Sequence, residues 1–269
     1  MTKSSSSTAL VTLLSILVPL ALSCIEQQDW KADQSIAPPT LRVLRSFPVE
    51  QSEDVPLNSP IWLEFDQYLE VSSLEPSPLL LESGSGTSAL RWRYHMVDKR
   101  LLASPITLQA DFRYRLSVDD TKLRSVEGAS LRRIPRFDFR TGNATADWGR
   151  QEPAPSNDEL EAIFDRSCSC HRLDPWPQSW YRIPRLDPKT LFGLPSWQAP
   201  EHLLVRPGAA WNSYLMFKAL PDYPHKQGSA MPPAWAKVSA SSRDLPSRAL
   251  DADELRRLEA WINAGAASN

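Results

Sequence analysis

Two cysteines and a histidine lie close together in the segment SCSCH, as Cys168, Cys170 and His171. Thiol and imidazole groups are nucleophiles, redox groups and metal ligands, so this cluster is where the chain could carry chemistry. The pattern CxxCH is typical of c-type haem attachment, because two cysteine sulfurs hold the haem and the adjacent histidine coordinates its iron. Cys170 and His171 have the required adjacency. Ser167, however, stands where the first cysteine of that pattern is expected.

Three other interpretations of the same residues stay open. A Cys168–Cys170 disulfide would close a very small loop with some strain, so it would stabilise little and would more plausibly be redox-active. Zinc would need Cys168, Cys170, His171 and a fourth ligand such as His202 or His225, yet no second CxxC or HxxxH supports it. The third is a fold that has kept its helices and lost its cofactor.

A methionine in a proline-containing loop is the candidate second ligand to the iron. Met231 lies in GSAMPP, between small residues and two prolines rather than on an apolar helix face. A Met or His from a distant loop completes the iron in cytochromes, and Met/His ligation raises the reduction potential. Met216, inside YLMFKAL, is expected in the core instead.

Helices are predicted on both sides of these residues. SNDELEAIF begins with Ser156 and Glu159 at capping-box spacing, and its apolar residues share one helical face. The segment NSYLMFKAL, 212–220, is a second candidate. DADELRRLEAWINAGA predicts a last helix, with Asp251 or Asp253 as N-cap and Gly265 as its end. The apolar positions of the first and last helices are Leu160, Ile163 and Phe164, and Leu255, Leu258 and Ile262.

The N-terminal half of the chain follows a different, period-two pattern. Apolar residues alternate in 61–65, 91–95, 114–118 and 137–139, and turn-forming clusters separate these runs. Short alternating strands of this kind predict an antiparallel β-sandwich. His95 stands alone on one of them, so we expect a structural role for it.

Residues 46–70, SFPVEQSEDVPLNSPIWLEFDQYLE, and the later segments LQADFRYRLSVDDTKLRSVEGASL and FDFRTG are similar to the bacterial Ig-like domains of S-layer and other surface proteins. The resemblance implies an Ig-like β-sandwich that serves as a spacer or display platform. It implies little about chemistry, because such folds host many functions.

The second half resembles the cytochrome-c-like domains of myxobacterial and planctomycete lipoproteins. The segments that carry the resemblance, in order, are IFDRSCSCH, LVRPGAAWNSYLMFKALPD, GSAMPP and LDADELRRLEAWINAGA. It implies a thioether at Cys170, His171 as proximal ligand and Met231 as distal ligand. Because Ser167 cannot form a thioether, either Cys168 attaches the other vinyl group, or Cys170 holds the haem alone, or no haem is bound.

The first 24 residues have the layout of an export signal. Lys3 precedes an apolar run, and small Ser23 stands before Cys24. The run is too short for a spanning helix. ALSC resembles a bacterial lipoprotein signal, which implies a lipidated Cys24 and a membrane anchor; an ordinary secretory signal is the alternative. The net charge of −2, without a run of like charges, gives no footprint for nucleic acid.

We therefore predict a multidomain chain that joins an all-β part to an all-α part. The expected segments are a signal peptide, 1–23; a tether, 24–40; an Ig-like β-sandwich, 41–142; a linker, 143–155; and a cytochrome-c-like helical domain, 156–269. The expected function is one-electron transfer through haem c by a lipid-anchored protein of the cell envelope, on its periplasmic or outer-membrane side, with an unidentified redox partner and no enzymatic activity. The alternative is a haem-less structural or interaction lipoprotein, with a Cys168–Cys170 disulfide or free thiols.

Overall fold

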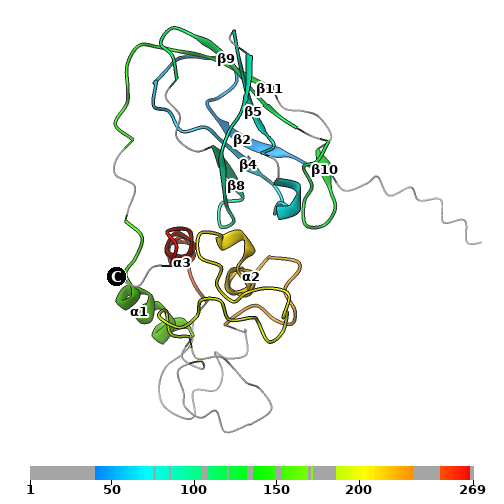
Figure 1. The fold of residues 1–269 in the computed structure, drawn as a ribbon, viewed down its shortest axis with the longest axis vertical. Helices are drawn as coiled ribbons and strands as arrows, with labels where there is room; N and C mark the ends of the chain where they lie inside the picture. The colour runs from blue at the N-terminus through cyan, green and yellow to red at the C-terminus, as the bar shows by residue number, and fades with distance from the viewer. Residues whose placement is uncertain are drawn as a thin grey trace, which may run out of the picture. The chain divides into compact units, whose positions relative to one another are not determined.

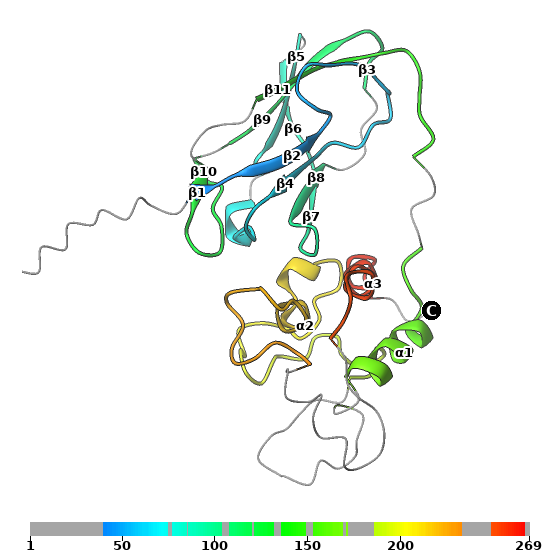
Figure 2. The same cartoon turned by 180° about the vertical axis from the view of Figure 1, so that it is seen from behind.

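The computed structural model describes residues 40–266, except 75–76, 85, 104–107, 120, 132–135, 149–152, 169–170, 172–185 and 233–248. The expected signal peptide, Cys24, the tether up to residue 39 and Cys170 lie outside the described residues. Figures 1 and 2 draw the elements from opposite sides. Within the described ranges, no helix has the length and apolar character needed to cross a membrane.

Two sheets form the β half, and they lie face to face (Figures 1 and 2). The first is antiparallel, in the order β2 (Val43–Phe47), β4 (Trp62–Phe65), β8 (Arg100–Ala103) and β7 (Trp92–His95). The second has the order β3 (Ser52–Val55), β11 (Arg136–Thr141), β9 (Arg113–Val118), β5 (Leu79–Ser83) and β6 (Gly86–Ala89), with β11 parallel to β3. Two short parallel strands, β1 (Thr40–Leu41) and β10 (Ser130–Leu131), and the 3₁₀ turn η1 (Val71–Leu74) complete this half.

The strand order is that of an immunoglobulin-like sandwich. When the strands are named in chain order, the first sheet reads A-B-E-D and the second reads A′-G-F-C-C′. Tyr114 lies at the start of the strand that corresponds to F, and its hydroxyl oxygen accepts the backbone N–H of Gln109 at 2.9 Å. This bond is the tyrosine corner found in such domains. The predicted β-sandwich is therefore confirmed.

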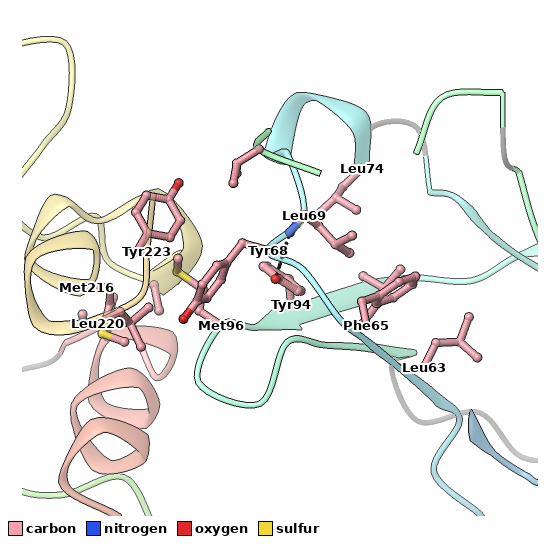
Figure 3. Close-up of a cluster of buried hydrophobic side chains, with 14 of the residues drawn as sticks. Leu63, Phe65, Tyr68, Leu69, Leu74, Tyr94, Met96, Met216, Leu220 and Tyr223 are labelled. Carbon is pink, nitrogen blue, oxygen red and sulfur yellow. Dashed lines mark hydrogen bonds between the residues drawn. The ribbon is translucent and has the colours of Figure 1, made fainter. Parts of the chain in front are cut away.

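Alternation along the strands fills the space between the two sheets with apolar side chains. Tyr94 on the end strand β7 is buried, and its hydroxyl accepts the backbone N–H of Leu69 at 3.0 Å, as the dashed line in Figure 3 shows. The same buried cluster continues into the helical half, so one contiguous core serves both. Figure 3 labels its members Leu63, Phe65, Tyr68, Leu69, Leu74, Tyr94, Met96, Met216, Leu220 and Tyr223.

Three helices occupy the predicted places: α1 (Asn157–Ser167), α2 (Tyr214–Ala219) and α3 (Ala252–Asn263), with a 3₁₀ turn η3 (Ala210–Asn212) before α2. Ser156 with Glu159, and Asp251 with Glu254, form complete capping boxes, so Asp251 rather than Asp253 caps the last helix. The chain leaves α3 through Gly265, whose φ of +97° favours glycine. Met216 is fully buried, as predicted.

Side chains connect the first helix to the last. Arg166 on α1 pairs with Glu254 on α3, and Arg257 on α3 pairs with Glu159 on α1. Between them, the indole N–H of Trp261 donates to the amide oxygen of Asn157 at 3.1 Å. Trp261 is buried, so this bond forms away from solvent. The two helices thus hold each other in place.

Candidate functional site

Helix α1 delivers the residues of the predicted haem motif. Cys168 is its C-cap, and its N–H donates to the carbonyl of Phe164 at 2.7 Å. The N–H of His171 then donates to the carbonyl of Cys168 at 2.8 Å, so the backbones of these two residues lie close together after the helix. Both side chains are half-buried. Cys168 and His171 are therefore close neighbours at a fixed helix end, whereas Cys170 lies outside the described residues.

Ser167 stands at the position where CxxCH would have its first cysteine. Its side chain is fully buried, and its Oγ has no hydrogen-bond partner among the residues that the structure describes. A buried hydroxyl without a partner loses the hydrogen bonds that water would give it, which costs about 1–3 kcal/mol. The position thus has the burial expected of a thioether cysteine but not its chemistry.

Met231 lies in a loop that is fastened to α2. Its N–H donates to the carbonyl of Lys218 at 2.7 Å, and the peptide bond to Pro232 is cis. The ammonium group of Lys218 donates to the carbonyl oxygens of Gln227 at 2.8 Å and Ser229 at 2.5 Å. Lys218 is buried, and this burial lowers its pKa. Sequence analysis missed these bonds between Lys218 and the loop. The signal that could have indicated them is the charged Lys218 inside the apolar run YLMFKAL.

The histidines considered as additional zinc ligands have other surroundings. His202 packs against aromatic rings, with its ring centroid 5.3 Å from that of Phe217 and 6.2 Å from that of Tyr214. His225 is exposed on a loop. In the part of the chain that the structure describes, no group of three or more His, Cys, Asp or Glu side chains could hold a metal ion. A zinc site that includes Cys170 would lie partly outside the described residues.

The donor types at these two places suit haem iron. An imidazole from His171 and a thioether from Met231 are the pair found in electron-transfer cytochromes. The residues following each ligand, 172–185 and 233–248, lie outside the described part. Only Ser167 departs from the donor set, because its oxygen cannot bond to a vinyl group. The donor types of His171 and Met231 are therefore compatible with haem iron, and covalent attachment would depend on the cysteines.

A second polar cluster, which sequence analysis missed, joins α3 to the β7–β8 turn. The carboxyl of Glu259 is buried and accepts the backbone N–H of Met96, and it lies 3.9 Å from Nδ1 of His95. Burial raises the pKa of Glu259 to about 8, although the bond from Met96 opposes the shift. Burial also lowers the pKa of His95. His95 thus has the structural surroundings predicted for it.

Three further contacts lie around this cluster. The hydroxyl of Tyr68 donates to Asp222, whose other oxygen lies 3.0 Å from the ammonium group of Lys99. Although burial would raise the pKa of Asp222, the hydrogen bonds from Tyr68 and Lys99 lower it. On the other side, the guanidinium of Arg256 lies 3.1 Å from Asp98. Charged pairs thus flank a buried carboxyl where the sandwich meets α3.

No model of a known protein family matches the sequence, and no characterised protein sequence matches it. Several solved structures share part of the fold. The S-layer protein rSbsC(31-844) is 10% identical over 44% of this chain and 16% of that chain, with a TM-score of 0.30. CopC from Methylosinus trichosporium OB3b is 10% identical over 38% and 93%, with a TM-score of 0.28. An L,D-transpeptidase from Mycobacterium smegmatis is 18% identical over 38% and 40%, with a TM-score of 0.28.

These similarities are too low to carry an argument about this chain. The chain spans only 16% of the S-layer protein and 40% of the transpeptidase. The immunoglobulin-like sandwich rests instead on the chain's own strand order and its tyrosine corner. A β-sandwich does not by itself indicate a function, because the same fold occurs in proteins of many functions.

Proposed function

We propose that this chain is an exported lipoprotein whose helical half binds haem c and transfers single electrons at the cell envelope. The observation that supports this most is the end of α1, where a capped helix leads directly to Cys168 and His171. His171 and Met231 would hold the iron. The haem would supply the redox chemistry, and the protein would supply ligands and orientation. A lipid on Cys24 would keep the carrier at the membrane.

In this proposal, Cys170 carries the haem through a single thioether. Cys170 keeps the adjacency to His171 that haem attachment requires, and Ser167 offers no sulfur at the other position. Cys168 is the C-cap of α1, and its backbone is held by the last turn of the helix. Its sulfur stands one residue away from the position that CxxCH gives to the first cysteine. We therefore assign the covalent bond to Cys170.

A second candidate function, a haem-less structural or interaction lipoprotein, has its own support. The sandwich and the helices share one buried core, which the ion pairs around Glu259 border. Ser167 is also fully buried. A rigid two-part scaffold needs no cofactor. The two functions differ in one measurable property, which is covalent haem.

Covalent haem is expected on the wild-type chain when it is produced with a cytochrome-c maturation system. After denaturation, the haem spectrum should stay with the polypeptide. We expect Cys170→Ser to abolish this retention and Cys168→Ser to leave it unchanged within about twofold, because only one thioether forms. Equal loss in both serine variants would contradict the single attachment. A wild-type chain that carries no haem in its native envelope would remove the electron-transfer function and leave the scaffold.

The loop residue Met231 has a separate expected effect. Met231→Ala should lower the reduction potential of the bound haem, because a weaker ligand or water would take the sixth position. Redox titration and the visible spectrum measure this change. Met216→Leu is the matched control, since Met216 is fully buried in the core and the change nearly conserves its volume. An unaltered potential in Met231→Ala would exclude this residue as a ligand.

A further inference from the structure

A groove of about 510 Å³ follows the outer edge of β7, where the sandwich faces η3. Trp92 from β7 and Trp211 from η3 line it, with ring centroids 5.7 Å apart and planes inclined by 46°. Both are half-buried, so part of each indole remains open to solvent. A concave space of this size with aromatic walls suits a ligand of a few rings.

Two arginines give the groove its charge. Arg91 and Arg93 line it on either side of Trp92 in the sequence, and both are exposed. Neither forms a hydrogen bond or ion pair through its guanidinium with the residues that the structure describes. No acidic side chain is among the described lining residues. Unpaired guanidinium groups bind carboxylates and phosphates in a bidentate manner, so the groove favours an anion.

Asn263 supplies hydrogen-bonding capacity at the end of α3. Its side-chain oxygen accepts the N–H of Ala210 at 3.0 Å, which fixes the side chain and leaves its amide N–H groups as donors. The groove thus combines aromatic faces, an oriented amide and two arginines that have no partner among the described residues. A sugar ring presents the matching features, because it has an apolar C–H face and a rim of hydroxyl groups.

We propose that this groove binds an anionic saccharide, a sugar that carries a carboxylate or a phosphate ester. The C–H face of the sugar packs on Trp92 or Trp211, a ring hydroxyl accepts from Asn263, and the anionic group pairs with Arg91 and Arg93. This binding is independent of the haem, and it adds a recognition function to either candidate above.

An acidic peptide that extends the sheet fits the groove less well. Strand β7 is the end strand of its sheet, and a free edge can accept another strand. Tyr94, however, is buried, and the N–H of Met96 is already bonded to Glu259. Only residues 91–93 remain for pairing, which is shorter than the usual strand of about five residues. The saccharide is therefore the occupant that the groove favours.

Calorimetric titration of the full chain in detergent tests the proposal. The probes are a trisaccharide of galacturonic acid, the neutral galactose trisaccharide and galactose 6-phosphate. We expect at least one anionic probe to bind about tenfold more tightly than the neutral one. The double variant Arg91→Gln/Arg93→Gln should weaken that binding about tenfold, while Arg113→Gln, an exposed arginine on β9, should not. The carboxylate and phosphate probes show which anion is preferred.

The tryptophan variants test the aromatic wall. Trp211→Ala should weaken anionic binding about tenfold and Trp211→Phe about threefold, because phenylalanine keeps a smaller ring. The exposed Trp197 gives the control Trp197→Ala, which should not change binding. Three results would each overturn the proposal: no binding of either anionic probe, equal binding of the neutral trisaccharide, or unchanged binding in the double arginine variant. Binding of a glutamate hexapeptide in place of the sugars would also overturn it.

Discussion

The free energy of unfolding is expected to fall by on the order of 4 kcal/mol as the pH rises from about 4.5 to about 8. The cause is Glu259, whose buried carboxyl has a pKa of about 8 in the folded chain against an ordinary value of 4.5. Between these values the folded chain holds a proton that the unfolded chain has released, so each step up in pH favours unfolding. Below this pH range Glu259 is protonated in both the folded and the unfolded chain, and above it Glu259 is ionised in both. Its contribution to the pH dependence of the free energy of unfolding is therefore confined to this range.

Urea unfolding at a series of pH values measures this slope, and Glu259→Gln isolates its cause. Glutamine can still accept the N–H of Met96 but carries no charge. We expect the variant to equal the wild type near pH 4.5 and to exceed its unfolding free energy by several kcal/mol at pH 8. The exposed carboxyl of Glu53 on β3 supplies the control Glu53→Gln, which should keep the wild-type slope. Parallel slopes for wild type and Glu259→Gln would show that Glu259 does not cause the dependence.

Other charged groups around Glu259 modify the size of this effect without reversing it. Asp98 raises the pKa of Glu259, whereas the bond from Met96 and the charge of Arg256 lower it. His95 acts in the opposite sense, because its lowered pKa makes the unfolded chain bind more protons below its ordinary value of 6.5. The variant comparison removes this contribution, since His95 is present in both chains.

The strands and helices of this fold follow from local sequence signals, whereas polar contacts between residues distant in the sequence do not. Alternation predicted strands such as 114–118, and the capping boxes at Ser156 and Asp251 predicted where two helices begin. These signals depend on residues that are close in the sequence. The sandwich and the helix ends could therefore be predicted without a structure.

Glu259 shows what sequence analysis overlooked. It falls on the same helical face as Leu255, Leu258 and Ile262, at the positions i, i+3, i+4 and i+7. An acidic residue within an apolar stripe is a signal of a buried polar contact, and it was available in the sequence. Its partner, the N–H of Met96, could not be predicted, because it depends on how a distant turn meets the helix. The groove between Trp92 and Trp211 has the same long-range origin.

The surroundings of the proposed cofactor residues could be predicted from the sequence only in part. The end of α1 fixes Cys168 and His171 next to each other, as the sequence indicated. The N–H of Met231 donates to the carbonyl of Lys218 on α2, a contact that the sequence did not reveal. Haem retention in Cys170→Ser measures whether a cofactor is attached beside His171.

Replacing Trp261 is expected to cause the largest loss of stability in the helical half. Trp261→Ala should lower the free energy of unfolding by about 3–5 kcal/mol, because it leaves a cavity at a fully buried position. The indole packs against Phe192, with ring centroids 5.6 Å apart, and donates to Asn157 on α1. Removing it also leaves the oxygen of Asn157 buried without a partner, which adds to the cost. Urea unfolding at constant pH measures the loss.

Two matched variants accompany this test. Trp261→Phe keeps an aromatic ring against Phe192 but loses the bond to Asn157 and part of the ring volume, so we expect a loss of about 1–3 kcal/mol. Trp197→Ala removes an exposed indole and should change stability by less than about 0.5 kcal/mol. An equal effect of alanine at 261 and 197 would contradict the buried link between α3 and α1. Cys168 and His171 follow directly after α1. If the helical half binds haem, the loss of stability in Trp261→Ala should therefore be accompanied by reduced haem retention.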